Sequence, residues 1–242
     1  MITAHADVVG SLLRPAELLL ARDDLAAGNM TQAEFQAIED QAVDEAIALQ
    51  EEAGLDIVTD GEMRRLSFQG QMTEAVDGFG EYNIDAFLWG DWYGDKTVGD
   101  INLERPANLG VVRKLRRKRY LSAAEFIYLQ ARTTRTPKIT LPSPSLWTNF
   151  WSPDISVCAY PTLDSFLADV VDILREEVTE LVRLGATYIQ LDAPHYPLLL
   201  DSKTRSFYEQ QGWALDDWLQ KGIEMDNTVI GGFHNVTFGF HL

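Results

Sequence analysis

Two segments of the chain share one pattern of apolar and polar positions. In residues 35–53 and 166–182 the apolar side chains recur every three or four positions, and a glycine follows each run. This spacing predicts two amphipathic helices, the first of them opened by a capping box at Thr31. Glycine tolerates the left-handed conformation that commonly ends a helix, so each helix is expected to stop there.

A short apolar stretch follows each predicted helix and leads to an acidic residue. Residues 55–59 lead to Asp60, and residues 187–191 lead to Asp192. The order helix, glycine, buried strand and acid indicates parallel strands joined by helical crossovers. Such folds place their chemistry just past the carboxyl ends of their strands, which is where both acids stand.

The remaining pattern predicts fewer strands than a closed barrel needs. Further strands are expected at 6–9, 138–141 and 236–240, and further helices from about Pro15 to just before Gly28 and over about 215–225. Glycines and aromatic residues interrupt residues 66–137, which we interpret as an excursion within a single domain spanning residues 1–242. With about five of the eight βα units of a barrel, the chain is expected to have an α/β fold of the (β/α)8 TIM-barrel type that is incomplete.

Composition and charge narrow the function classes. The chain has 242 residues, of which 46% are hydrophobic, and its 20 basic and 37 acidic residues give a net charge of −17. An acidic total disfavours nucleic acid as a partner, because phosphate backbones attract basic surfaces. No apolar run approaches the roughly 18 residues of a membrane span, and residues 1–7 lack signal-peptide features. The single cysteine, Cys158, excludes an internal disulfide, so we expect a cytoplasmic protein.

The corner after the first repeated strand carries the strongest candidate chemistry. Asp60, Glu62, Arg64 and Arg65 lie together there, either as a substrate-binding carboxylate with a nearby cation or as a solvated loop with local ion pairs. Spacing alone gives these readings equal weight. Asp192 at the equivalent corner of the second unit favours the first, because two converging carboxylates can hold an ammonium group.

Other candidates carry weaker signals. Ser11 follows the strand expected at 6–9 and could bind a carboxylate or cap the next helix. Trp147 could stack on a planar ligand, although core packing is the commoner fate of a tryptophan. His241 is the best placed of four histidines to bind a metal, but no second ligand stands at a metal-binding spacing. The basic run 113–119 is interpreted as a solvated face and Cys158 as an idle thiol.

Five stretches, taken in chain order, resemble the cobalamin-independent methionine synthase family, most closely its short single-domain members. They are residues 8–15, 55–65, 138–144, 188–194 and 238–242. They extend over nearly the whole chain. Any one of them alone is a weak signal, but five in the right order are specific to the family.

The resemblance implies a (β/α) barrel with a zinc ion at the carboxyl ends of its strands. In the family, zinc holds homocysteine as a thiolate, which takes a methyl group from a methyl-folate donor to give methionine. By resemblance, Ser11 helps bind the carboxylate of the amino acid, and Glu62 and Asp192 bind its ammonium group. Trp147 stands where the family places a tryptophan near the folate, and His241 matches the first zinc ligand.

The chain departs from the family pattern near its end. The family has a cysteine within two residues of the ligand histidine, whereas this sequence stops at Leu242, before the remaining zinc ligands and a proton-transferring histidine. One histidine does not make a tetrahedral zinc site. Ala193 also replaces the glutamate of the family's usual Asp-Glu-Pro. We therefore expect a C-terminally truncated chain that is inactive as a methyltransferase unless the missing part is supplied.

Two alternatives to homocysteine methylation stay open. One keeps the zinc-thiolate chemistry but alkylates coenzyme M with an epoxide, as related proteins do. The other is a non-catalytic remnant that binds a small amino acid or nothing. In either case an open five-strand assembly leaves a sheet edge uncovered, so we expect self-association through that edge.

Overall fold

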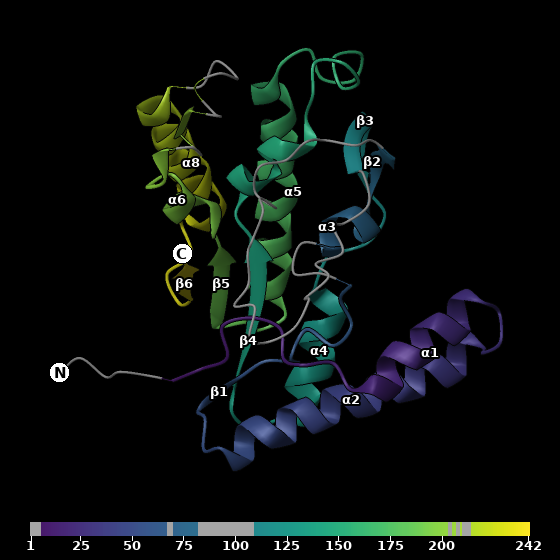
Figure 1. Cartoon of the computed structure of the whole chain (residues 1–242). Helices are drawn as coiled ribbons and strands as arrows, with labels where there is room; N and C mark the ends of the chain where they lie inside the picture. Colours follow the sequence, from purple (N-terminus) through teal and green to yellow (C-terminus); the bar gives the residue numbers. More distant parts are fainter. Residues whose placement is uncertain (1–5, 67–69, 82–108, 203–204, 207–208, 210–213) are drawn as a thin grey trace.

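A four-stranded parallel sheet forms the centre of the molecule (Figure 1). The computed structural model describes residues 6–66, 70–81, 109–202, 205–206, 209 and 214–242. Within them the sheet has the order β1-β4-β5-β6, and every neighbouring pair is parallel. The strands are β1 (Ile57–Val58), β4 (Thr136–Pro142), β5 (Tyr188–Asp192) and β6 (Thr237–His241). Their carboxyl ends therefore meet at one edge of the sheet.

Helices cover this sheet, and the two longest begin as the sequence predicts. Thr31 and Thr162 each accept a hydrogen bond from the backbone three residues on and thereby cap a 21-residue helix. The helices are α1 (Ala16–Ala26), α2 (Gln32–Glu52), α3 (Gly70–Ala75), α4 (Ala123–Arg132), η2 (Pro144–Phe150), α5 (Leu163–Arg183), α6 (His195–Leu198) and α8 (Leu215–Ile230). No helix in the described ranges has both the length and the apolar character needed to cross a bilayer.

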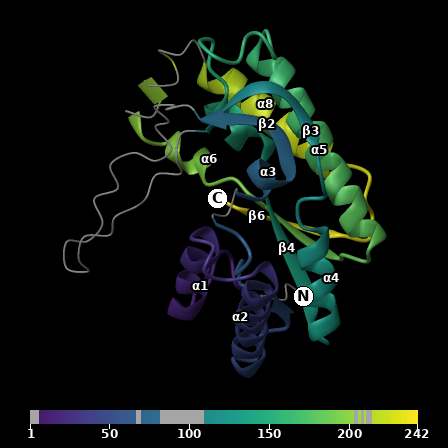
Figure 2. The same ribbon diagram turned by 90° about the vertical axis from the view of Figure 1, so that its right-hand side faces the viewer.

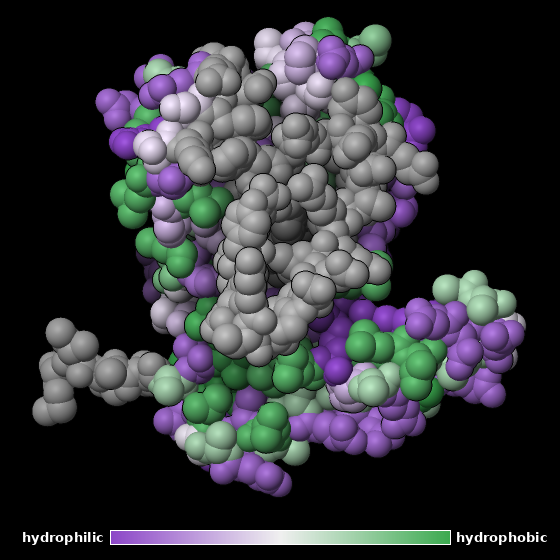
Figure 3. All heavy atoms as spheres, in the orientation of Figure 1, coloured by the Kyte–Doolittle hydropathy of each residue, from purple (hydrophilic) through white to green (hydrophobic). Residues whose placement is uncertain are grey.

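The two largest clusters of buried apolar side chains hold most of these elements together. The larger joins the inner face of α5, including Phe166, Val170 and Leu174, to Ile139 of β4 and Ile189 of β5. The smaller lies between α1, α2 and α4. Figure 2 shows α1 and α2 side by side at one end of the molecule, away from α5 and α8. Their outer surface mixes hydrophobic with hydrophilic residues (Figure 3).

The segment expected as an irregular excursion contains regular structure. The antiparallel strands β2 (Val76–Glu81) and β3 (Leu109–Arg117) pair with each other, and α4 follows them. Most of the basic run lies exposed on β3 and just after it, where Arg116 pairs with Asp77 and Arg117 with Glu176. Charge pairing on an exposed ribbon explains this run without a phosphate ligand. The aromatic centre of the excursion, residues 82–108, lies outside the described residues.

The strand expected at residues 6–9 is absent, so the sheet has four parallel strands in the described residues rather than five. Side chains of the sheet bind this segment instead of a neighbouring backbone. Lys138 Nζ donates to Asp7 Oδ2 and to the Val8 carbonyl, and Gln190 Nε2 donates to the Val9 carbonyl. With these carbonyls taken by side chains, the segment crosses the sheet without forming a ladder.

Candidate functional site

The corner after β1 has an unusual backbone. Gly61 has φ 68° and Glu62 has φ 55°, so two consecutive residues adopt left-handed conformations. A non-glycine residue held there costs on the order of 1 kcal/mol and persists only where its surroundings fix it. Asp60 supplies part of this fixation, because its Oδ1 accepts the Glu62 N–H at 2.9 Å. The result is a turn that buries the Glu62 side chain at the carboxyl edge of the sheet.

Three donors hold the Glu62 carboxylate. Ser11 Oγ donates to Oε2 at 2.5 Å, while Thr140 Oγ1 and Arg65 Nη1 donate to Oε1 at 2.7 and 3.1 Å. The structure thus joins Ser11 and Glu62, which the sequence analysis singled out separately. The helix-capping alternative for Ser11 is wrong, since the N-cap of α1 is Pro15.

Arg65 is a cation enclosed by protein. Its Nε and Nη2 atoms donate to Glu125 Oε2 at 3.1 and 2.9 Å, and its side chain is 2% exposed. Burial lowers the pKa of Arg65, but the charges of Glu125 and Glu62 outweigh that effect and raise it overall. Arg65 therefore stays protonated at any pH at which the fold exists.

Asp192 ends β5 at the same edge of the sheet, with β4 between it and β1. Its Oδ1 accepts hydrogen bonds from Gln190 Nε2 at 2.6 Å and from His241 Nδ1 at 3.0 Å. Burial raises the pKa of Asp192, and the negative charge of Glu62 raises it further. The two predicted carboxylates therefore act on each other electrostatically, and a cation bound between them would relieve that repulsion.

Asp60, two residues before Glu62, is a further buried carboxyl of the site. Its Oδ2 atom is buried without a hydrogen-bond partner among the described residues. Burial and the charge of Glu125 raise the pKa of Asp60 to about 6. The corner therefore changes its negative charge close to neutral pH.

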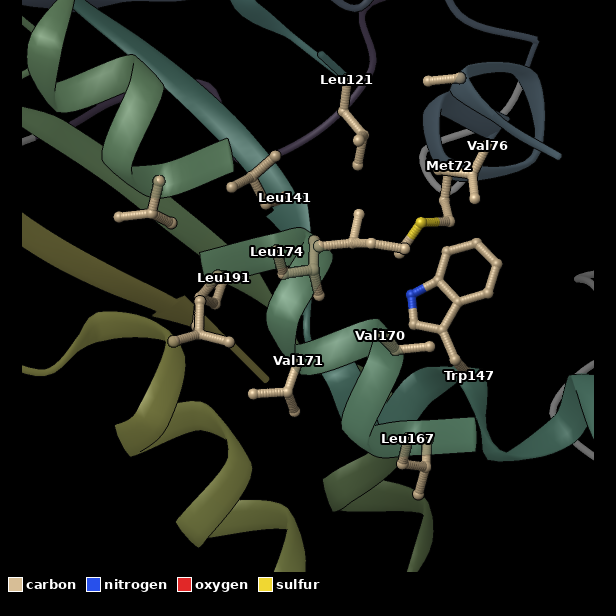
Figure 4. Close-up of a cluster of buried hydrophobic side chains, with 14 of the residues drawn as sticks. Met72, Val76, Leu121, Leu141, Trp147, Leu167, Val170, Val171, Leu174 and Leu191 are labelled. Carbon is tan, nitrogen blue, oxygen red and sulfur yellow. The ribbon is translucent and has the colours of Figure 1, made fainter. Parts of the chain in front are cut away.

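Trp147 lies away from this polar cluster, inside the larger apolar core. It is fully buried against Phe79 and Phe150, and the Met72 side chain points toward its indole ring (Figure 4). Its Nε1 atom has no hydrogen-bond partner in the described residues. The core-packing alternative accounts for this position, and a stacking role toward a folate stays a prediction.

The described residues do not fit a zinc ion. They contain no group of three or more His, Cys, Asp or Glu side chains that could hold a metal. His241 Nδ1 is engaged by Asp192, and Cys158 is exposed in the loop after η2. A protein zinc site takes roughly three or four such ligands. We therefore assign no chemical step to a metal in this part of the chain.

Sequence reasoning missed two polar networks behind the predicted residues. The first is the Thr140–Arg65–Glu125 group described above. The second packs α6 and α8 onto the end of β4: His195 Nε2 lies 2.8 Å from Ser145 Oγ, and Asp226 accepts from Ser143 and Tyr196. A polar residue inside an apolar run, such as Thr140 between Ile139 and Leu141, is the available signal for such groups.

Comparisons with known proteins show what this chain is similar to. A family model described as "Cobalamin-independent synthase, Catalytic domain" matches residues 1–228. The chain is 32% identical to a methionine synthase of Pyrococcus abyssi over 189 residues, which is 77% of this chain and 51% of that protein. It is 29% identical over 229 residues to a 5-methyltetrahydropteroyltriglutamate–homocysteine methyltransferase of Thermosynechococcus vestitus, covering 92% of this chain and 27% of that one.

The fold is also found among solved structures. A B12-independent methionine synthase from Shewanella sp. W3-18-1, in complex with selenomethionine, matches with a TM-score of 0.68 at 21% identity. The match covers 98% of this chain and 60% of that one. The chain therefore spans about half the length of the archaeal relative and less than two thirds of this structural neighbour.

Proposed function

Because the chain belongs to the family of cobalamin-independent synthase catalytic domains, we propose that it carries the amino-acid-binding part of an enzyme that methylates homocysteine. The observation that carries this proposal is the pair of buried carboxylates, Glu62 and Asp192, at the carboxyl edge of one parallel sheet. Buried carboxylates whose orientation is fixed by hydrogen bonds are suited to binding an ammonium group. The names of the relatives supply the reaction, which is a proposal for this chain.

In this proposal Glu62 and Asp192 bind the ammonium group of homocysteine. The Ser11 hydroxyl is engaged with Glu62, so the loop around Ser11 would bind the substrate carboxylate through its backbone N–H groups. The thiolate sulfur of homocysteine then attacks the methyl carbon of a methyl-folate. A carbon–sulfur bond forms, the carbon–nitrogen bond of the folate breaks, and the released nitrogen takes a proton.

The two acidic corners favour an amino acid over coenzyme M as the thiol. Coenzyme M has a sulfonate and no ammonium group, so buried carboxylates would repel it. The remaining alternative is a non-catalytic remnant. It would have the same amino-acid site as the methyltransferase and would differ from it only in not transferring a methyl group. Methyl transfer measured with homocysteine and a methyl-folate separates these two cases.

Binding of the amino acid is the first test. Titration calorimetry with L-homocysteine and with the product L-methionine should show one site per chain. Glu62→Gln and Asp192→Asn should each weaken binding by at least tenfold. Glu39→Gln is a matched control, because Glu39 is a similarly enclosed carboxylate that pairs with the neighbouring Arg64. Equal binding by wild type and both site variants would refute the proposal.

Zinc provides a separate test. Because the described residues do not form a metal site, chelator treatment should leave amino-acid binding and the unfolding temperature of this chain unchanged. A single tightly bound zinc ion per chain, lost together with binding, would show that His241 finds ligands elsewhere.

We also propose that the four-stranded sheet belongs to a (β/α) barrel and that residues 1–242 form one domain, with residues 66–137 as an excursion from it. The parallel order β1-β4-β5-β6 and the family membership support this. Limited proteolysis should release no stable fragment smaller than this domain.

A further inference from the structure

Arg65 presents a problem for the proposed ammonium site. Its Nη1 atom donates to Glu62 Oε1 at 3.1 Å, so a permanent positive charge contacts the carboxylate that would bind a cation. At this distance in a buried site, a guanidinium group competes strongly with an ammonium group for the same negative charge. The site therefore needs a second negative charge that offsets Arg65.

Glu125 on α4 supplies that charge. Two of the three guanidinium nitrogens of Arg65, Nε and Nη2, donate to Glu125 Oε2 at 3.1 and 2.9 Å. Gln71 Nε2 donates to the same oxygen at 2.9 Å and to Ser122 Oγ at 2.6 Å. Glu125 is 8% exposed, so its charge is little screened by solvent. The negative charge that offsets Arg65 therefore comes from α4, which is 60 positions away from Arg65 in the chain.

Arg65 is also saturated as a hydrogen-bond donor. Besides its contacts with the two glutamates, Nη1 donates to Thr140 Oγ1 at 2.6 Å and Nη2 to the Thr140 carbonyl at 3.2 Å. Since Arg65 only donates, Thr140 Oγ1 must accept from it and direct its own proton to Glu62 Oε1. The network thus fixes the orientation of the Glu62 carboxylate.

We propose that Glu125 is a positioning residue, which neutralises Arg65 and so keeps Glu62 available as an anion for the ammonium group of the amino-acid ligand. This inference rests on the proposed function. Glu125 does not touch the ligand in this scheme and acts only through Arg65. Its loss should therefore affect the ammonium group and leave the rest of the ligand's binding intact.

The test compares two ligands that differ in one group. L-methionine carries the ammonium group, and 4-(methylthio)butanoate is the same molecule without it. Glu125→Gln should weaken L-methionine binding by about tenfold or more and change the affinity of the desamino acid less than twofold. Glu39→Gln should change neither affinity, because Glu39 pairs with Arg64. If Glu125 has only a structural role, Glu125→Gln should instead lower the affinities for both ligands equally.

A charge-compensated variant covers the case in which Glu125→Gln does not fold. The double change Arg65→Gln with Glu125→Gln removes one charge of each sign, and the Glu62 carboxylate then keeps the Ser11 and Thr140 hydroxyls as its donors. It should bind L-methionine within a few-fold of wild type, and a loss of preference for L-methionine over the desamino acid would overturn the inference. If wild type binds no amino acid, the proposed function fails. If wild type binds L-methionine and Glu125→Gln keeps the same ligand preference, only the inference fails.

Discussion

Asp192 and His241 are paired both through the sheet and through their side chains. They are opposite partners in the register of β5 and β6, and His241 Nδ1 lies 3.0 Å from Asp192 Oδ1. The Ala193 N–H also donates to the His241 carbonyl at 2.8 Å. The last described strand therefore fixes the carboxylate at the end of the strand before it.

Removing His241 should test this support. We expect His241→Ala to weaken L-methionine binding several-fold, because Asp192 keeps Gln190 as a second donor. Asp192→Asn should weaken it by tenfold or more, since it removes the charge itself. Titration calorimetry measures both. If His241→Ala proves as damaging as Asp192→Asn, the histidine contacts the ligand directly.

Ser11→Ala removes one of the three donors to Glu62. We expect a loss of about 1 kcal/mol in the free energy of unfolding, the usual contribution of one such hydrogen bond. Amino-acid binding should weaken about fivefold to tenfold as the carboxylate loses its fixed orientation. Urea denaturation and calorimetry check these values. Thr228→Ala is the control, because its exposed hydroxyl bonds only the Glu224 carbonyl among the described residues.

Asp60 should make the protein less stable as the pH rises. Its pKa is raised to about 6 in the folded state, so folded molecules bind a proton that unfolded ones have released. Stability therefore falls as the pH rises through about 4 to 6. From pH 5 to pH 7 the free energy of unfolding of Asp60→Asn should therefore rise by about 1 kcal/mol relative to that of wild type. Urea denaturation at both pH values measures this, and the exposed Asp56→Asn should show no such gain.

His195 should act in the opposite direction. Burial lowers its pKa to about 3, so the folded protein keeps it neutral while the unfolded chain binds a proton below pH ~6.5. Stability due to this group is lost as the pH falls. From pH 7 to pH 5, His195→Gln should lose about 2 kcal/mol less than wild type. As a control, a variant of the exposed His234, His234→Gln, should lose as much stability between pH 7 and pH 5 as wild type does. The same loss in His195→Gln would contradict the prediction and show that the imidazole of His195 is accessible to solvent.

The main sheet could largely be predicted from the sequence, because its strands are apolar runs bounded by local signals. The strands predicted at 138–141, 187–191 and 236–240 are confirmed with small shifts of their ends, and the one predicted at 55–59 forms over Ile57–Val58 only. The strand predicted at residues 6–9 does not form, and the reason is physical. Whether an apolar stretch forms a strand depends on which groups reach its backbone, and here these are Lys138 and Gln190, which the local pattern does not reveal.

The candidate site, like the sheet, could be predicted from the sequence only in part. The acidic corners follow from the rule that parallel strands end at one edge, so Glu62 and Asp192 could be found from the sequence. The partnership of Arg65 with Glu125 could not, because it forms only when α4 packs against β4 and comes close to the corner after β1. In a sequence, a charged residue of the interior looks like any charged residue of the surface.

Gly61 has a consequence for anyone who wishes to redesign this protein for a different ligand. A Cβ atom added there would lie 3.0 Å from Ala46 Cβ and 3.3 Å from Leu12 Cδ1, on a backbone that already disfavours side chains. The turn is thus a fixed point, and mutant libraries that vary it should yield unfolded protein. Ala193, which follows Asp192, offers no easier position, because it is fully buried and a larger side chain would have to displace its neighbours. A redesign for a new ligand therefore has to leave the backbone of this turn unchanged.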